Sequence, residues 1–127
     1  MERKSCENLA AAGTLANLDD PCPNAATTRA YYAAYQAVWS KLEERNVPVP
    51  EVRPGVVYFK HDEVAPLAQE HRLFDQRLAL RFEDLREARV KADYYLDGCT
   101  QDEAREHVQS AKMIVESLLG EGCCDDQ

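Results

Sequence analysis

The stretch LREARVKADYY, residues 85–95, closes a long helical pattern and places a charged residue on its apolar side. The apolar positions recur at helical spacing, at Leu78, Phe82, Leu85, Ala88 and Ala92. At about 100° per residue, Arg89 falls inside this stripe. Because burying an unpaired guanidinium is costly, Arg89 needs a partner or a solvated groove, and Asp93 stands one turn further on. Two interpretations are open: a structural Arg89–Asp93 pair, or a contact to nucleic acid or a nucleotide in a cleft.

The segments on either side of this stretch also have the periodicity of helices. Helical patterns cover residues 2–18, 24–46, 62–73 and 74–95, and a last helix runs from Thr100 to Gly120. Thr100 and Glu103 form a T-x-x-E capping box at the start of that helix, and Gly98 is a stop signal for the helix before it. We predict an all-α, up-down bundle of about five helices over residues 1–120, with a disordered polar tail at 121–127.

The proline-rich segment 47–60 interrupts the helical pattern. It contains three of the six prolines, so we expect a loop with a short extended piece at 56–59. One short apolar run does not form a sheet by itself. The sequence therefore predicts that this segment lies over the helices as a cover.

Composition limits the classes of function. The 127 residues carry a net charge of -8, which argues against nucleic-acid binding through bulk electrostatics but leaves room for a local basic groove. No run approaches the roughly 18 apolar residues of a membrane span, and the N-terminus lacks the apolar core of a signal peptide. We expect a cytoplasmic protein that is neither exported nor inserted in a membrane.

The cysteines are odd in number, and their spacing fits no zinc motif. They are Cys6, Cys22, Cys99, Cys123 and Cys124. In a cytoplasmic protein all five are expected to be reduced thiols. Metal binding by the adjacent pair in the tail is the alternative, although no metal or other cofactor is predicted.

Two further residues have both a structural and a functional interpretation. Tyr32 lies at the edge of the apolar stripe of segment 24–46. It is either an aromatic residue of the core, or it faces a partner helix or a stacked base. His61 lies just before a predicted helix start. It is either a structural residue there or a functional one, because the start of a helix is a natural anion site. Motifs for phosphate loops, serine hydrolases, zinc proteases and di-iron bundles are all missing from the sequence.

Three stretches, in this order and spacing, carry a resemblance to a known family. They are TRAYYAAY at 28–35, KHDEV at 60–64 and LREARVKADY at 85–94. Together they resemble the HEPN family (higher eukaryotes and prokaryotes nucleotide-binding domain), most closely its small stand-alone prokaryotic members, which often accompany minimal nucleotidyltransferases. The resemblance covers about residues 2–119.

The resemblance implies a helical bundle that usually dimerises, with the arginine matched by Arg89 near the dimer cleft. Many members of the wider family are metal-independent ribonucleases whose motif is arginine, four to six residues, then histidine. In this chain Tyr94 stands where that histidine could be. Metal-independent RNA cleavage needs a group that moves protons near neutral pH, and tyrosine, with an ordinary pKa near 10, is a poor substitute for histidine.

Three hypotheses of function follow. The first is a non-catalytic HEPN-like binding module, a homodimeric component of a toxin–antitoxin or nucleotidyltransferase pair, with Tyr32 and Asp93 on the partner or dimer face. The second is a ribonuclease whose candidate catalytic residues are Arg89 with Tyr94, or with His61 brought close by the fold. The third is a non-catalytic RNA or nucleotide binder. Its expected cationic contacts are Arg29, Arg86, Arg89 and Lys91.

Overall fold

The computed structural model describes residues 1–94 and 98–124, and within them the chain is mostly helical. The elements in order are α1 (Glu2–Ala16), α2 (Pro23–Glu44), β1 (Glu51–Arg53), β2 (Val56–Val57), α3 (Val64–Glu70), α4 (Gln76–Tyr94) and α5 (Gln101–Leu119). The all-α class is thus confirmed, and each predicted helix is present. Residues 95–97 and 125–127, which include the end of the stretch 85–95 and the end of the tail, lie outside the described residues.

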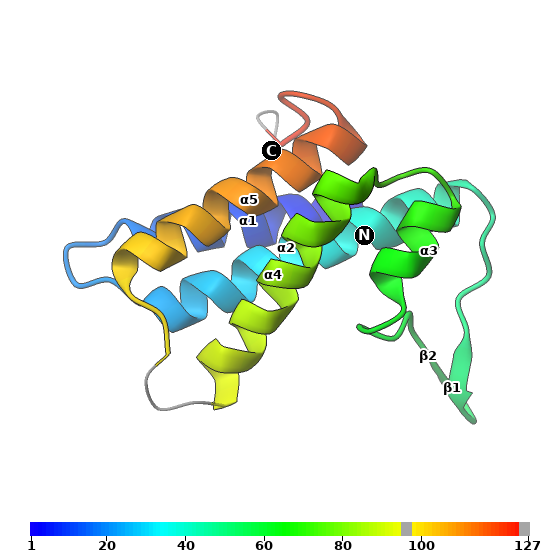
Figure 1. The fold of residues 1–127 in the computed structure, drawn as a ribbon, viewed down its shortest axis with the longest axis horizontal. Helices are drawn as coiled ribbons and strands as arrows, with labels where there is room; N and C mark the ends of the chain where they lie inside the picture. Colours follow the sequence, from blue (N-terminus) through cyan, green and yellow to red (C-terminus); the bar gives the residue numbers. More distant parts are fainter. Residues whose placement is uncertain (95–97, 125–127) are drawn as a thin grey trace.

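Helix α2 is the centre of the core. It contacts α1, α3, α4 and α5, and in Figure 1 α4 runs across it at an angle. Ala30, Ala33, Ala34 and Ala37 are fully buried, and such small side chains let neighbouring helices approach closely. Ten of the 22 residues of α2 are buried, whereas five of the 19 residues of α4 are.

The segment between α2 and α3 differs from its prediction. The extended piece pairs with residues upstream of it, and β1 and β2 form a short antiparallel hairpin. Gly55, with a φ of 77°, makes the turn that the pairing requires. The hairpin points away from the helices in Figure 1, and Val57 is 55% exposed, so the expected cover is wrong for the hairpin. Only Phe59, just after it, is buried in the core.

The last helix begins as its sequence predicts. The Thr100 hydroxyl accepts from the backbone N–H of Glu103, and the Glu103 carboxylate accepts from the backbone N–H of Thr100, so the capping box is complete. Ahead of it, Gly98 has a φ of 53° and the adjacent Cys99 N–H donates to the Asn24 side chain. This contact ties the start of α5 to the start of α2.

The C-terminal segment returns to the first helix. Residues 121–124 form a turn after α5, and Cys124 is joined to Cys6 of α1 by a disulfide. The expectation of five reduced thiols is therefore wrong for these two residues. Their pairing depends on how α1 and α5 pack, which no spacing of cysteines along the chain records. No helix in the described part of the chain has the length and apolar character to cross a membrane.

Candidate functional site

Arg89 lies between α4 and α2 with most of its side chain covered. The side chain is 14% exposed, and the guanidinium carbon lies 5.3 Å from the ring centre of Tyr31 and 5.9 Å from that of Tyr32. Both distances are within the range of cation–π attraction. Its Nε is buried and has no hydrogen-bond partner among the described residues. The helical spacing that placed Arg89 in the apolar stripe therefore located a real feature of the packing.

Asp93 joins the two helices at this point. It accepts from Nη1 of Arg89 at 3.4 Å and from the Thr28 hydroxyl of α2 at 2.6 Å. The predicted Arg89–Asp93 pair is confirmed. Because the guanidinium has a carboxylate and two aromatic rings against it, much of its charge is balanced within the chain.

His61 is brought to the same cluster from the loop before α3. Its Nδ1 lies 2.6 Å from the Tyr31 hydroxyl, and its ring centre lies 4.6 Å from that of Tyr35 and 5.9 Å from that of Tyr32. Burial lowers the pKa of His61, and the positive charges of Arg89 and Arg86 lower it further. His61 is therefore neutral at neutral pH.

Tyr31 and Tyr35, which lie against His61, stay protonated at neutral pH. Burial raises the pKa of Tyr31 well above its ordinary value, although the charge of Arg89 opposes this. Burial also raises the pKa of Tyr35 to about 12, and its hydroxyl donates to the backbone oxygen of Phe59 at 2.6 Å. Tyr31 and Tyr35 are thus hydrogen-bonding groups at neutral pH and do not act as bases.

A shallow groove of about 390 Å³ opens beside the cluster. It is lined by Asn24, Ala25, Thr28, Arg29, Tyr32 and Asp93. Nη1 of Arg29 donates to the side-chain oxygen of Asn8 in α1 at 3.1 Å. The groove therefore presents one cation, one carboxylate and one aromatic ring, a mixed set that suits a polar protein surface as well as a single phosphate.

The remaining predicted site residues lie elsewhere or have other partners. Arg86 pairs with Glu83 at 3.0 Å on α4 itself. Lys91 is exposed. Burial lowers the pKa of His107 on α5, and the positive charge of Lys91 also lowers it. Tyr94 is 74% exposed at the end of α4. The structure thus brings Arg29, Tyr32, His61, Arg89 and Asp93 together and leaves Lys91 facing α5.

Sequence reasoning missed two contacts of this site, Tyr31 with His61 and Thr28 with Asp93. Both residues of α2 fall in the stretch 28–35, but helical spacing alone does not show which residues outside that helix they contact. A larger hollow of about 690 Å³ lies between α4 and α5, lined in part by Arg81 and Arg105, and none of the clustered residues reaches it.

Potential metal ligands occur at another place. Among the described residues, the sulfur atoms of Cys6, Cys123 and Cys124 lie within 4.8 Å of one another. The His61 cluster contributes no member to this group.

Comparisons of the chain with protein-family models, with curated proteins and with solved structures each gave no match.

Proposed function

We propose that the chain is a non-catalytic helical binding module of the HEPN type, arranged as an up-down bundle, which works as a homodimer and as one component of a toxin–antitoxin or nucleotidyltransferase pair. The three matching stretches support the family. The observation that carries the non-catalytic part is the state of Arg89: its charge is balanced by Asp93 and by the rings of Tyr31 and Tyr32. An arginine held in this way is suited to fixing the geometry of a surface.

The groove next to Arg89 is the proposed dimer face. Tyr32 and Asp93 both line it and both contact Arg89, so the cluster fixes their positions before binding. Tyrosine and arginine are the residue types most often found where binding energy concentrates at interfaces, and Tyr32 with Arg29 supplies both. A net charge of -8 also suits a protein partner better than RNA.

The test of this proposal is the dissociation constant of the dimer, measured by sedimentation equilibrium. Tyr32→Ala and Arg29→Ala should each weaken the dimer by at least about 30-fold, which is the effect of losing an interface hot spot. Leu80→Ala is the matched control, because Leu80 is 59% exposed and lies nine residues before Arg89, half a turn round α4. A monomeric wild type, or a dimer weakened only by the control, would contradict the proposed face.

A metal-independent ribonuclease is the second candidate, and one observation favours it. His61 and Arg89 contact the same two tyrosine rings, so the fold supplies a neutral histidine close to an arginine. In such a reaction His61 would take the proton of the ribose 2′-hydroxyl as that oxygen attacks the adjacent phosphorus. Arg89 would stabilise the charge on the phosphate, and the 5′-oxygen would leave and take up a proton.

The discriminating assay is incubation of the purified protein with mixed single-stranded RNA in the presence of a metal chelator. The ribonuclease requires cleavage that disappears in Arg89→Ala and in His61→Ala and persists in Tyr94→Phe. The binding module predicts no cleavage by any of the four proteins. Salt-dependent retention of intact RNA would instead support the third hypothesis, an RNA or nucleotide binder, because each phosphate contact releases counterions.

A further inference from the structure

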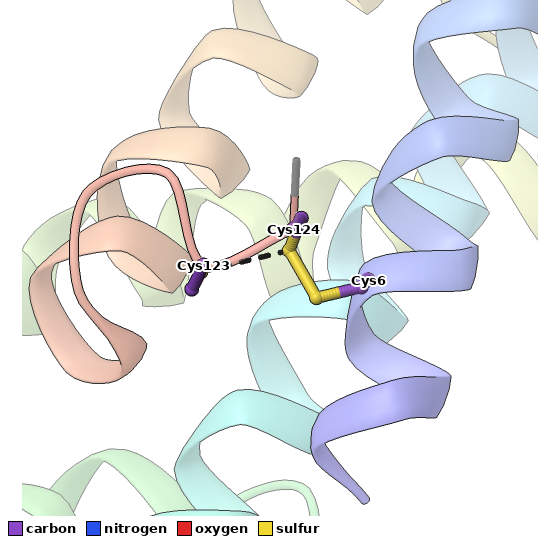
Figure 2. Close-up of side chains that lie close together, drawn as sticks. All are labelled: Cys6, Cys123 and Cys124. Carbon is purple, nitrogen blue, oxygen red and sulfur yellow. Dashed lines mark hydrogen bonds between the residues drawn. A yellow bond between two sulfur atoms is a disulfide. The ribbon is translucent and has the colours of Figure 1, made fainter. Parts of the chain in front are cut away.

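Three cysteines from the two ends of the chain meet on one side of the bundle. Figure 2 shows Cys6 on α1, and Cys123 and Cys124 on the turn that follows α5. Cys6 and Cys124 form the disulfide, with their Cα atoms 5.2 Å apart. The sulfur of Cys123 lies 3.6 Å from that of Cys124, and all three sulfurs fall within 4.8 Å.

The disulfide is not what holds this cluster in place. Cys6 is 2% exposed, and its neighbour Ser5 donates from its hydroxyl to the backbone oxygen of Ala33 at 2.6 Å, which fixes this part of α1 on α2. Helices α1 and α5 contact each other, and both Cys123 and Cys124 pack against the main core. Cleavage of the disulfide therefore leaves three thiols close together on a folded chain.

We propose that the reduced chain binds one thiophilic d¹⁰ cation, Zn²⁺, through the sulfurs of Cys6, Cys123 and Cys124. A phosphine together with one water molecule, or a dithiol, supplies the two electrons and two protons that convert the disulfide into two thiols. The phosphine takes the oxygen of that water and leaves as the phosphine oxide, whereas the dithiol leaves as a cyclic disulfide. Binding then releases three protons, because zinc is held by thiolates. A water molecule completes the four-coordinate shell.

The distances fit this coordination. With Zn–S bonds of about 2.3 Å and tetrahedral angles, two thiolates on one zinc lie about 3.8 Å apart. The 3.6 Å between the sulfurs of Cys123 and Cys124 is close to that separation. The sulfur of Cys6 is bonded to that of Cys124 in the oxidised chain, so the two must separate to about 3.8 Å once the bond is cleaved, within the 4.8 Å that encloses all three sulfurs. Thiolates select soft and borderline metals over Mg²⁺ and Ca²⁺, which prefer oxygen ligands.

The redox state of the compartment decides whether the chain carries the disulfide or three thiols. In an oxidising compartment the disulfide persists, whereas a reducing compartment keeps the three thiols available to the metal. Cys123 is the residue that distinguishes a three-sulfur metal site from a simple disulfide pair, because it is dispensable for the bond between Cys6 and Cys124.

The experiment titrates the full chain, reduced with a phosphine and desalted without oxygen, with Cd²⁺ as a spectroscopic probe. Thiolate-to-metal charge transfer should rise to an end point at about one equivalent, and Zn²⁺ should displace the probe. Cys123→Ser should weaken binding by more than about tenfold, since even losing an outer-shell partner costs that much. Cys22→Ser, which changes an exposed thiol, should bind as the wild type does.

A second measurement identifies the ligand residues directly. Zn²⁺ should protect Cys123 and Cys124 of the reduced chain from alkylation, read by mass spectrometry, and leave the exposed Cys22 reactive. Circular dichroism of the reduced Cys123→Ser chain without metal, compared with the reduced wild type, shows whether a loss of binding is a loss of fold. Unchanged binding in Cys123→Ser, loss of binding in Cys22→Ser, or no one-equivalent end point would each overturn the proposal.

Discussion

Removing the bond between Cys6 and Cys124 should strongly destabilise the chain. The bond links positions 118 residues apart, so it restricts almost the whole unfolded chain. In the chain-entropy model a loop of that length lowers the entropy of the unfolded state by about 16 cal/mol/K, or about 4.9 kcal/mol at 25 °C. Residual structure in the reduced, unfolded chain offsets part of this. We expect reduction to lower the free energy of unfolding by about 3 to 5 kcal/mol.

Equilibrium urea unfolding in a chelator, with and without a phosphine reductant, measures this loss. The midpoint of the wild type should fall by roughly 2 M urea on reduction. The urea midpoint of Cys6→Ala should equal that of the reduced wild type and should not change when the reductant is added, because Cys6 takes part in the bond. Cys123→Ser, beside the bond but outside it, should keep the full response. A wild type whose stability changes by less than about 1 kcal/mol on reduction would refute the argument from loop length.

Three smaller predictions concern His61, Gly98 and Thr100. The folded-state pKa of His61 lies below the ordinary value of about 6.5. Neutral His61 therefore contributes its full stability above pH 6.5, and this contribution is lost as the pH falls through the folded pKa. Thermal unfolding across this pH range should show a smaller loss of stability in His61→Asn than in the wild type. Gly98→Ala places a Cβ 2.4 Å from the Asn24 side chain at a φ of 53°, and it should lower the free energy of unfolding by about 2 to 3 kcal/mol in urea. Gly13→Ala is the control within helix α1, where no atom lies within 4 Å of the added Cβ, and it should raise the free energy of unfolding by about 0.5 to 1 kcal/mol. Thr100→Ala removes the side-chain acceptor of the capping box and should cost about 1 kcal/mol, a loss that Thr100→Ser should largely avoid.

The helices could be predicted from the sequence because their signals are local. The stripe over 74–95 predicts α4, and the capping box places the start of α5. The hairpin was missed because β1 has only three residues and β2 only two, too few for alternation to be recognised, so their pairing is visible only once the turn at Gly55 is built. The sequence does not reveal the central position of α2, because alanines give a weak apolar signal although they allow close packing.

The candidate site shows the same division between local and tertiary information. The Arg89–Asp93 pair was predictable, since one helical turn separates the two residues. His61 and Tyr31 are 30 residues apart, and their contact depends on where the loop before α3 lies on α2. Thr28 and Asp93 are 65 residues apart, and their contact depends on how α4 crosses α2. A charge on an apolar stripe can therefore locate a site in the sequence, but it does not reveal what balances that charge. In this chain the balance comes from α2, and it is that balance, more than the missing histidine after Arg89, that favours a binding surface over a catalytic one.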